Sequence, residues 1–100
     1  NPKAKPSWFG FIITLRENTP FSRNSLVRYL ENKKIATRML FGGNLTYQPA
    51  YKNLNHRVIS KLENTNYVMN NSFWIGVYPG INKQKMDYVI QIIDEYLKTK

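Results

Sequence analysis

The residues best suited to bind a ligand gather in one stretch near the middle of the chain, residues 37–51. Arg38 lies in an otherwise apolar run, and its planar guanidinium can hold a carboxylate or a phosphate through paired hydrogen bonds. Phe41 then precedes Gly42-Gly43-Asn44, where backbone N–H groups on a flexible turn can face an anion. With the side-chain amide of Gln48, this stretch is interpreted as a loop presented to a ligand.

Each of these features also has a purely structural explanation. An arginine in a strand commonly projects into solvent, and a pair of glycines often forms an ordinary turn because glycine accepts a positive φ. The spacing and the lysine of a P-loop are missing around Gly42-Gly43. The short distance in sequence between Arg38 and the two glycines favours the ligand role.

Several kinds of chemistry are excluded within these 100 residues. The chain has no cysteine, so disulfides, thiolate metal sites and a cysteine nucleophile are ruled out, and a reducing cytoplasmic location is expected. His56 is the only histidine and cannot build a multi-histidine metal site alone. No pair of acids has the placement that general acid–base work needs. The chain alone therefore does not resemble a complete enzyme.

The charge balance favours anionic partners. Fifteen Lys and Arg face six Asp and Glu, for a formal net charge of +9. Scattered lysines also suit a plain solvated surface. Phe9-Gly10-Phe11-Ile12 matches the middle of the RNA-recognition signature, although Ser7, Trp8 and Thr14 depart from it. A basic module for RNA or phosphorylated ligands is thus an alternative function.

The elements that must position the loop follow from periodicity and capping residues. Apolar and β-branched runs predict strands at residues 8–15, 35–41 and 73–78. Helical spacing predicts long helices at residues 23–33 and 83–97, capped by Ser22 and Asn82. The long C-terminal helix should bury Met86, Val89, Ile90, Ile93 and Leu97.

The segment after the glycines is expected to be irregular at residues 44–55, with a short turn or helix from Pro49. Short helices are expected at residues 56–62 and, capped by Asn64, at residues 65–70. No apolar run is long enough to span a membrane.

These elements predict an α+β fold, with two long helices on one face of a small three-stranded sheet. Residues 1–6 contain two prolines and two lysines and are interpreted as a linker from an upstream domain. Residues 7–98 would form one small domain. Because the chain starts with Asn1, we expect it to be a fragment of a longer protein.

Five motifs occur in order along residues 6–80: PSWFGF (6–11), PFSR (20–23), TRMLFGGNL (37–45), QPAY (48–51) and MNNSFWIGVYPG (69–80). Together they resemble the C-terminal domain of the DegT-type sugar aminotransferase family. Within it they look most similar to the lipopolysaccharide-biosynthesis branch typified by CDP-4-keto-6-deoxyglucose 3-dehydrase. The resemblance covers residues 6–97, and several motifs in register make it more specific than any single one.

The resemblance implies a small, mostly antiparallel sheet with helices packed on it, as in the small domain of PLP-dependent transferases. It implies a homodimeric enzyme that acts on a nucleotide sugar in lipopolysaccharide synthesis. Dehydrases of this branch use pyridoxamine phosphate and a two-iron iron–sulfur cluster, and aminotransferases of the family use pyridoxal phosphate. We expect either cofactor to be bound by an upstream domain and none by this fragment.

The resemblance implies functional roles for only a few residues of this chain. It implies substrate contacts for Arg38, Phe41, Asn44 and Gln48. Support for these contacts is expected from three aromatic residues, Trp8, Phe11 and Trp74. His56 lies outside the matching motifs and is not assigned as a catalytic base. The fragment alone should be inactive, and neither a membrane nor a nucleic acid is expected as its partner.

Overall fold

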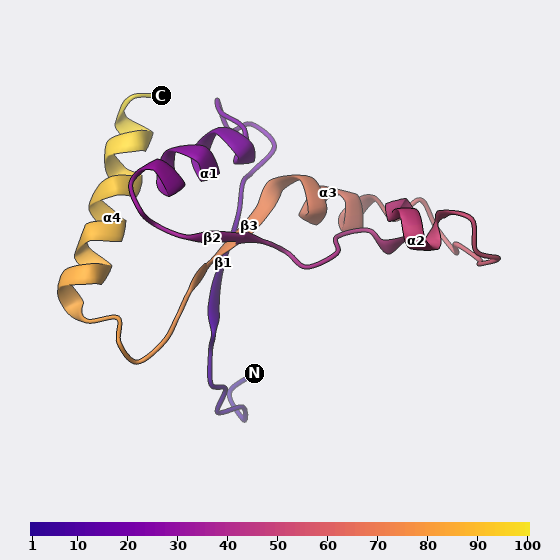
Figure 1. The fold of residues 1–100 in the computed structure, drawn as a ribbon, viewed down its shortest axis with the longest axis horizontal. Coiled ribbons are helices and arrows are strands. Elements are labelled where there is room, and N and C mark those ends of the chain that lie inside the picture. The colour runs from indigo at the N-terminus through magenta and orange to yellow at the C-terminus, as the bar shows by residue number, and fades with distance from the viewer.

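The computed structural model describes all 100 residues and confirms an α+β fold around one small sheet (Figure 1). The elements in chain order are β1 (Gly10–Thr14), α1 (Arg23–Asn32), β2 (Thr37–Met39), the 3-10 helix η1 (Leu45–Tyr47), α2 (Pro49–Lys52), α3 (Glu63–Asn71), β3 (Ser72–Gly76) and α4 (Lys83–Lys98). Helices α1 and α4 lie on one side of the crossing strands, and η1, α2 and α3 extend away on the other.

The sheet has the strand order β1-β3-β2, and both pairings are antiparallel. The central strand, β3, therefore holds the two outer strands, and each outer strand has one unpaired edge. Cα partners such as Ile12, Trp74 and Arg38 align across all three strands. The predicted three-stranded sheet is confirmed. All three strands are shorter than predicted, although single backbone hydrogen bonds from Val77 to Phe9 and from Leu15 to Asn71 extend the contact between β1 and β3.

Helix α1 forms where the capping and spacing rules place it. The Ser22 hydroxyl accepts a hydrogen bond from the Ser25 N–H at 3.2 Å, which confirms the predicted N-cap. Leu26 and Leu30 are buried against the sheet, one turn apart on the same stripe. The helix ends at Asn32, and Lys34 adopts a left-handed φ of 65° that turns the chain toward β2.

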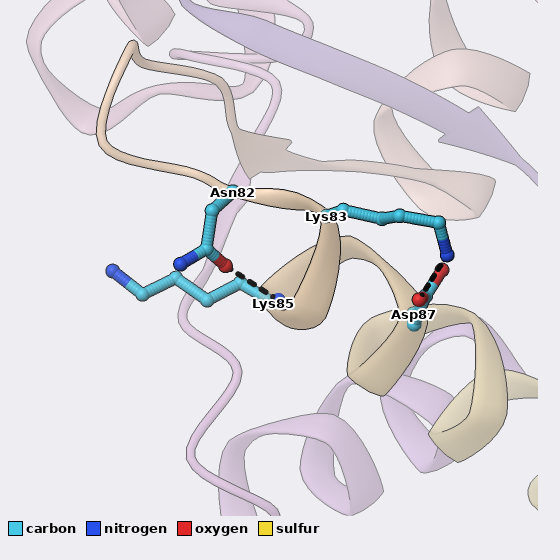
Figure 2. Close-up of polar contacts among 4 residues, drawn as sticks. All are labelled: Asn82, Lys83, Lys85 and Asp87. Atoms are coloured by element: carbon cyan, nitrogen blue, oxygen red, sulfur yellow. Dashed lines mark hydrogen bonds and ion pairs between the residues drawn. The ribbon is translucent and has the colours of Figure 1, made fainter.

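Helix α4 is capped as predicted but rotated about its axis. Figure 2 shows the Asn82 side-chain oxygen accepting from the Lys85 N–H at 3.0 Å, with Lys83 paired to Asp87 one turn on. The buried residues are Ile92 and Tyr96, with Val89 and Ile93 partly buried beside them. The predicted inward residues Met86, Ile90 and Leu97 are exposed.

The rotation of α4 has a physical cause in the ring of Tyr96. It packs edge-on against Phe21, with ring centroids 5.1 Å apart, and tilted against Tyr29 at 4.9 Å. Its hydroxyl bonds to the Ser25 hydroxyl at 2.6 Å. A tyrosine can be buried when its hydroxyl finds a partner, and a hydrophobicity pattern does not count it as an inward residue.

The hydrophobic core is small for the length of the chain. It consists of seven buried residues: Leu15, Leu26, Leu30, Ile35, Phe73, Ile92 and Tyr96. Only ten of the 100 residues are buried. The radius of gyration is 16.4 Å, whereas a compact domain of this length has about 13 Å. The fold is therefore elongated and leaves much apolar surface exposed.

The elongation comes from residues 45–62, which form an arm that reaches away from the sheet (Figure 1). The predicted helix at residues 56–62 is wrong, since these residues form no helix and Ile59 is 86% exposed. Three apolar residues on one side cannot stabilise a helix without a surface to cover. The predicted Asn64 cap is also wrong. Helix α3 begins at Glu63, after Leu62 in a left-handed conformation.

Residues 1–6 form no helix or strand and are exposed, while their role as a linker stays a prediction. None of the helices combines the length and the apolar character that crossing a membrane requires.

Candidate functional site

Alternation along the strands divides the candidate residues between the two faces of the sheet. Residues that are Cα partners in neighbouring strands project to the same face. Phe73 belongs to the core, so Ile13 and Met39, its partners, mark the helix-covered face. Trp74 and its partner Arg38 therefore lie on the opposite, open face, where no helix covers them.

Arg38 presents an exposed guanidinium on this open face. Its Nη1 donates to the Thr37 carbonyl oxygen at 2.9 Å, which is the only hydrogen bond of the side chain. A guanidinium has five N–H donors, so most of its donors remain free. The group is therefore held near its own strand and can still bind a carboxylate or phosphate.

Beyond Arg38 the chain turns through two positive φ angles. Phe41 has a φ of 47° and is 76% exposed. Gly43 has a φ of 62°, and a Cβ built there would lie 2.5 Å from Met69 Cγ. The second glycine is thus required both by backbone conformation and by the close approach of α3. The predicted double-glycine turn is present.

Asn44 and Gln48 hold the loop in shape in this structure. Asn44 is 3% exposed, and its oxygen accepts from the Thr46 N–H at 3.0 Å and the Thr46 hydroxyl at 2.7 Å. Gln48 Nε2 donates to the Gly42 carbonyl oxygen at 2.7 Å, which closes residues 42–48 into a ring of contacts. Their predicted substrate contacts stay predictions beside these structural roles.

Helix α3 supports the loop through two residues that the sequence analysis did not select. Asn66 accepts from Asn44 Nδ2 at 2.8 Å and donates to the Tyr47 hydroxyl at 3.3 Å. The sulfur of Met69 accepts from the Asn44 N–H at 3.3 Å. The bonded partners are separated by 22 and 25 positions in the sequence, and no spacing rule links residues so far apart. Only the folded structure therefore identifies this support.

The three aromatic residues predicted to support the site are not brought together. Trp74 lies on the open face beside Arg38, and its indole N–H donates to the Met39 carbonyl oxygen at 3.2 Å. Phe9 packs edge-on against it, with centroids 5.3 Å apart. Phe11 pairs with Ile75 and so points to the helix-covered face, and Trp8 precedes β1 and is 70% exposed.

The sequence around Arg38 and the loop is rich in basic residues. Between Glu31 and Glu63 the chain has no acidic residue and six Lys or Arg: Lys33, Lys34, Arg38, Lys52, Arg57 and Lys61. Such a stretch attracts phosphate groups. This acid-free stretch is a sequence signal that the motif analysis missed.

Glu31 is the exception at the border of this region. Hydrogen bonds from the Thr37 N–H and hydroxyl, together with the nearby charge of Arg38, lower the pKa of the Glu31 carboxyl below its ordinary 4.5. It therefore stays charged at neutral pH.

The structure has no metal-ligating cluster, and two open hollows lie away from the glycine loop. No cluster of three or more His, Cys, Asp or Glu side chains could hold a metal ion. Two open hollows, lined mainly by polar residues, lie beside α1 and Tyr96 and at residues 60–65. Neither of these two hollows is lined by Arg38 or by the glycine loop, and Arg38 lies exposed at the surface.

The chain belongs to the DegT/DnrJ/EryC1/StrS aminotransferase family, whose model matches residues 1–94.

Two curated relatives and one solved structure illustrate the similarity. The chain is 48% identical over 94 residues to the lipopolysaccharide biosynthesis protein RfbH of Salmonella typhimurium. It is 46% identical over 96 residues to the dTDP-4-dehydro-2,6-dideoxy-D-glucose 3-dehydratase of Saccharopolyspora spinosa. A crystal structure of GDP-4-keto-6-deoxymannose-3-dehydratase with a trapped PLP-glutamate geminal diamine shares the fold, with a TM-score of 0.75 at 24% identity.

Each match covers most of this chain but only a small part of the related protein. The matches take in 94% and 96% of this chain but only 22% and 21% of the two curated relatives. The structural match covers 85% of this chain and 22% of the solved one. The chain thus spans about a fifth of the length of these enzymes.

Proposed function

We propose that this chain is the C-terminal, substrate-facing domain of an enzyme that dehydrates a nucleotide-linked 4-keto-6-deoxyhexose at C3, for O-antigen or lipopolysaccharide synthesis. The observation that carries the proposal is the identity of 46–48% across nearly the whole chain to a sugar 3-dehydratase and to a lipopolysaccharide biosynthesis protein. The open, positive face around Arg38 supports it, because a nucleotide sugar brings a diphosphate.

In this proposal Arg38 binds the diphosphate or sugar hydroxyls of the substrate, and Phe41 covers an apolar part of it. Asn44 and Gln48 hold the loop, and their hydrogen-bonding groups that are not used within the loop bind the sugar. Trp74 supports Arg38 on the open face through its bond to the Met39 carbonyl. None of these residues moves a proton, so the chemical step belongs to other parts of the enzyme.

The remainder of the full-length enzyme would supply the cofactor and the second wall of the site. That cofactor is proposed to be pyridoxamine or pyridoxal phosphate, with a two-iron iron–sulfur cluster if the reaction is a dehydration. It provides the means to withdraw electrons from the sugar. The proposed partners are the upstream domain and a second subunit. The exposed aromatics Phe9 and Phe41 and the open sheet face give such partners a surface to cover.

The test uses the full-length enzyme, in the cytoplasmic fraction where we propose it resides. Purified enzyme is incubated with a CDP-, dTDP- or GDP-linked 4-keto-6-deoxy sugar, a reductant and, separately, glutamate. Loss of the C3 hydroxyl supports the dehydrase proposal. An amino sugar formed from glutamate supports the alternative, a sugar aminotransferase, which the name of the matched family favours. Neither product would refute both.

The Arg38 role is tested by Arg38→Ala against Arg28→Ala, a second exposed arginine that lies on α1 away from the open face. We expect Arg38→Ala to raise KM by roughly tenfold or more, the scale of a lost charge-assisted hydrogen bond. Equal KM values in the two variants would remove Arg38 from the site.

A further inference from the structure

We propose that Glu31 is a positioning residue that directs Arg38 to the open face of the sheet. This inference rests on the proposed function, because it assigns a purpose to the direction in which Arg38 points. Its structural basis is a double hydrogen bond between the last turn of α1 and the first residue of β2.

The contact joins one carboxylate oxygen to both donors of one residue. Glu31 Oε1 accepts from the Thr37 N–H at 2.7 Å and from the Thr37 hydroxyl at 2.8 Å. Thr37 is 6% exposed, whereas Glu31 lies at the surface. The backbone and the side chain of Thr37 are therefore fixed together, so the residue cannot rotate without losing both bonds.

The strand that carries Arg38 has only a short ladder to hold its register. β2 is three residues long, lies at the edge of the sheet and pairs only with β3. Side chains alternate between faces along a strand, so a slip of one residue exchanges the two faces. By holding the Thr37 hydroxyl toward α1, Glu31 places the next side chain, Arg38, on the opposite face.

The bond network continues from Thr37 to Arg38 itself. The Thr37 carbonyl oxygen accepts from Arg38 Nη1 at 2.9 Å, so the residue that Glu31 fixes also steadies the guanidinium. The Met39 carbonyl oxygen is held in turn by the Trp74 indole. Each residue of β2 thus has a side-chain bond beyond the ladder, and the bonds at Thr37 come from outside the sheet.

The test measures KM and kcat of the full-length enzyme with its nucleotide-sugar substrate. We expect Glu31→Ala to raise KM roughly five- to tenfold, the scale of one or two lost hydrogen bonds, with kcat within about twofold. Glu31→Asp keeps the charge but is one methylene too short, and should raise KM similarly. Glu31→Gln keeps an acceptor oxygen and should restore KM to within about threefold.

Two comparisons separate positioning from general destabilisation. Glu95→Ala removes another exposed helix acid, one bonded only to Gln91, and should leave KM unchanged. In a double-mutant cycle, Glu31→Ala added to Arg38→Ala should raise KM no further, because Glu31 acts through Arg38. If the fold-increases in KM from the two substitutions multiply in the double variant, the inference is overturned. An unchanged KM in both Glu31→Ala and Glu31→Asp would also overturn it.

Failure of the proposed function looks different from failure of this inference. If Arg38→Ala alone leaves KM unchanged, Arg38 does not bind substrate, and the inference falls with the site. If Arg38→Ala impairs binding and the Glu31 variants do not, the site stands and the positioning role is wrong.

Discussion

Replacing Gly43 with alanine should open the loop that carries the candidate site. A residue with a Cβ at a φ of 62° costs about 1–2 kcal/mol. The new Cβ would also lie 2.5 Å from Met69 Cγ and 2.9 Å from its sulfur, and overpacking of this kind costs about 1–3 kcal/mol. The expected total is about 2–5 kcal/mol of local stability. Movement of Met69 would also break its bond to the Asn44 N–H.

Gly42→Ala is the matched control, because it makes the same change one residue earlier. Gly42 has no positive φ, and a Cβ there meets only Leu45 Cδ2, at 2.9 Å. Leu45 is exposed, and the far end of its side chain can rotate away. We expect Gly42→Ala to change local stability by less than about 1 kcal/mol.

Hydrogen exchange of the full-length enzyme measures the difference over residues 42–48. Since about 1.4 kcal/mol corresponds to tenfold, Gly43→Ala should speed exchange there by roughly 30-fold or more. Met69→Ala combined with Gly43→Ala should recover part of that loss, because it removes the crowding but not the cost of the positive φ. Equal exchange in Gly42→Ala and Gly43→Ala would refute the argument that α3 and the backbone angle dictate this glycine.

Three further outcomes are expected. Phe73→Ala, at a fully buried position, should lower the free energy of unfolding by about 3–5 kcal/mol, whereas Ile90→Ala, 65% exposed, should change it by less than about 0.5 kcal/mol in the same denaturant titration. Ser22→Ala removes the α1 cap and should cost about 1 kcal/mol, recovered largely by Ser22→Asp. The Glu31–Thr37 bonds should contribute fully to stability above pH 4.5 and be lost progressively as pH falls below it, because the folded pKa is lowered; acid titration of Glu31→Gln should lack this component.

Local rules predicted the parts of this fold that local contacts determine. Ser22 and Asn82 cap their helices because each side chain reaches a backbone N–H within one turn. The double-glycine turn also follows from residues close in sequence. The sheet does not, because β3 pairs with strands far away in sequence, and its antiparallel arrangement was expected only from the family resemblance. The family resemblance, which drew on long motifs in register, is confirmed by the match over residues 1–94.

Contacts between distant residues caused the errors. The inward face of α4 was misplaced because Tyr96 meets Phe21, Tyr29 and Ser25 on elements far away in sequence. Residues 56–62 have a helical pattern but little packing surface within the chain, so they form no regular element and are mostly exposed.

The candidate site divides in the same way between local and distant contacts. Its residue types were readable from the motif around Arg38. Its support from Glu31, Asn66 and Met69 was not, because these residues lie on other elements and meet the loop only after folding.

The small core has a consequence for the life of the polypeptide in a cell. With ten buried residues and side chains such as Trp8, Ile59 and Phe41 mostly exposed, a copy of this domain that lacks a covering surface displays what chaperones and proteases bind. Assembly with the rest of the enzyme would hide that surface. An unassembled copy is therefore expected to be bound by chaperones and proteases more readily than an assembled one.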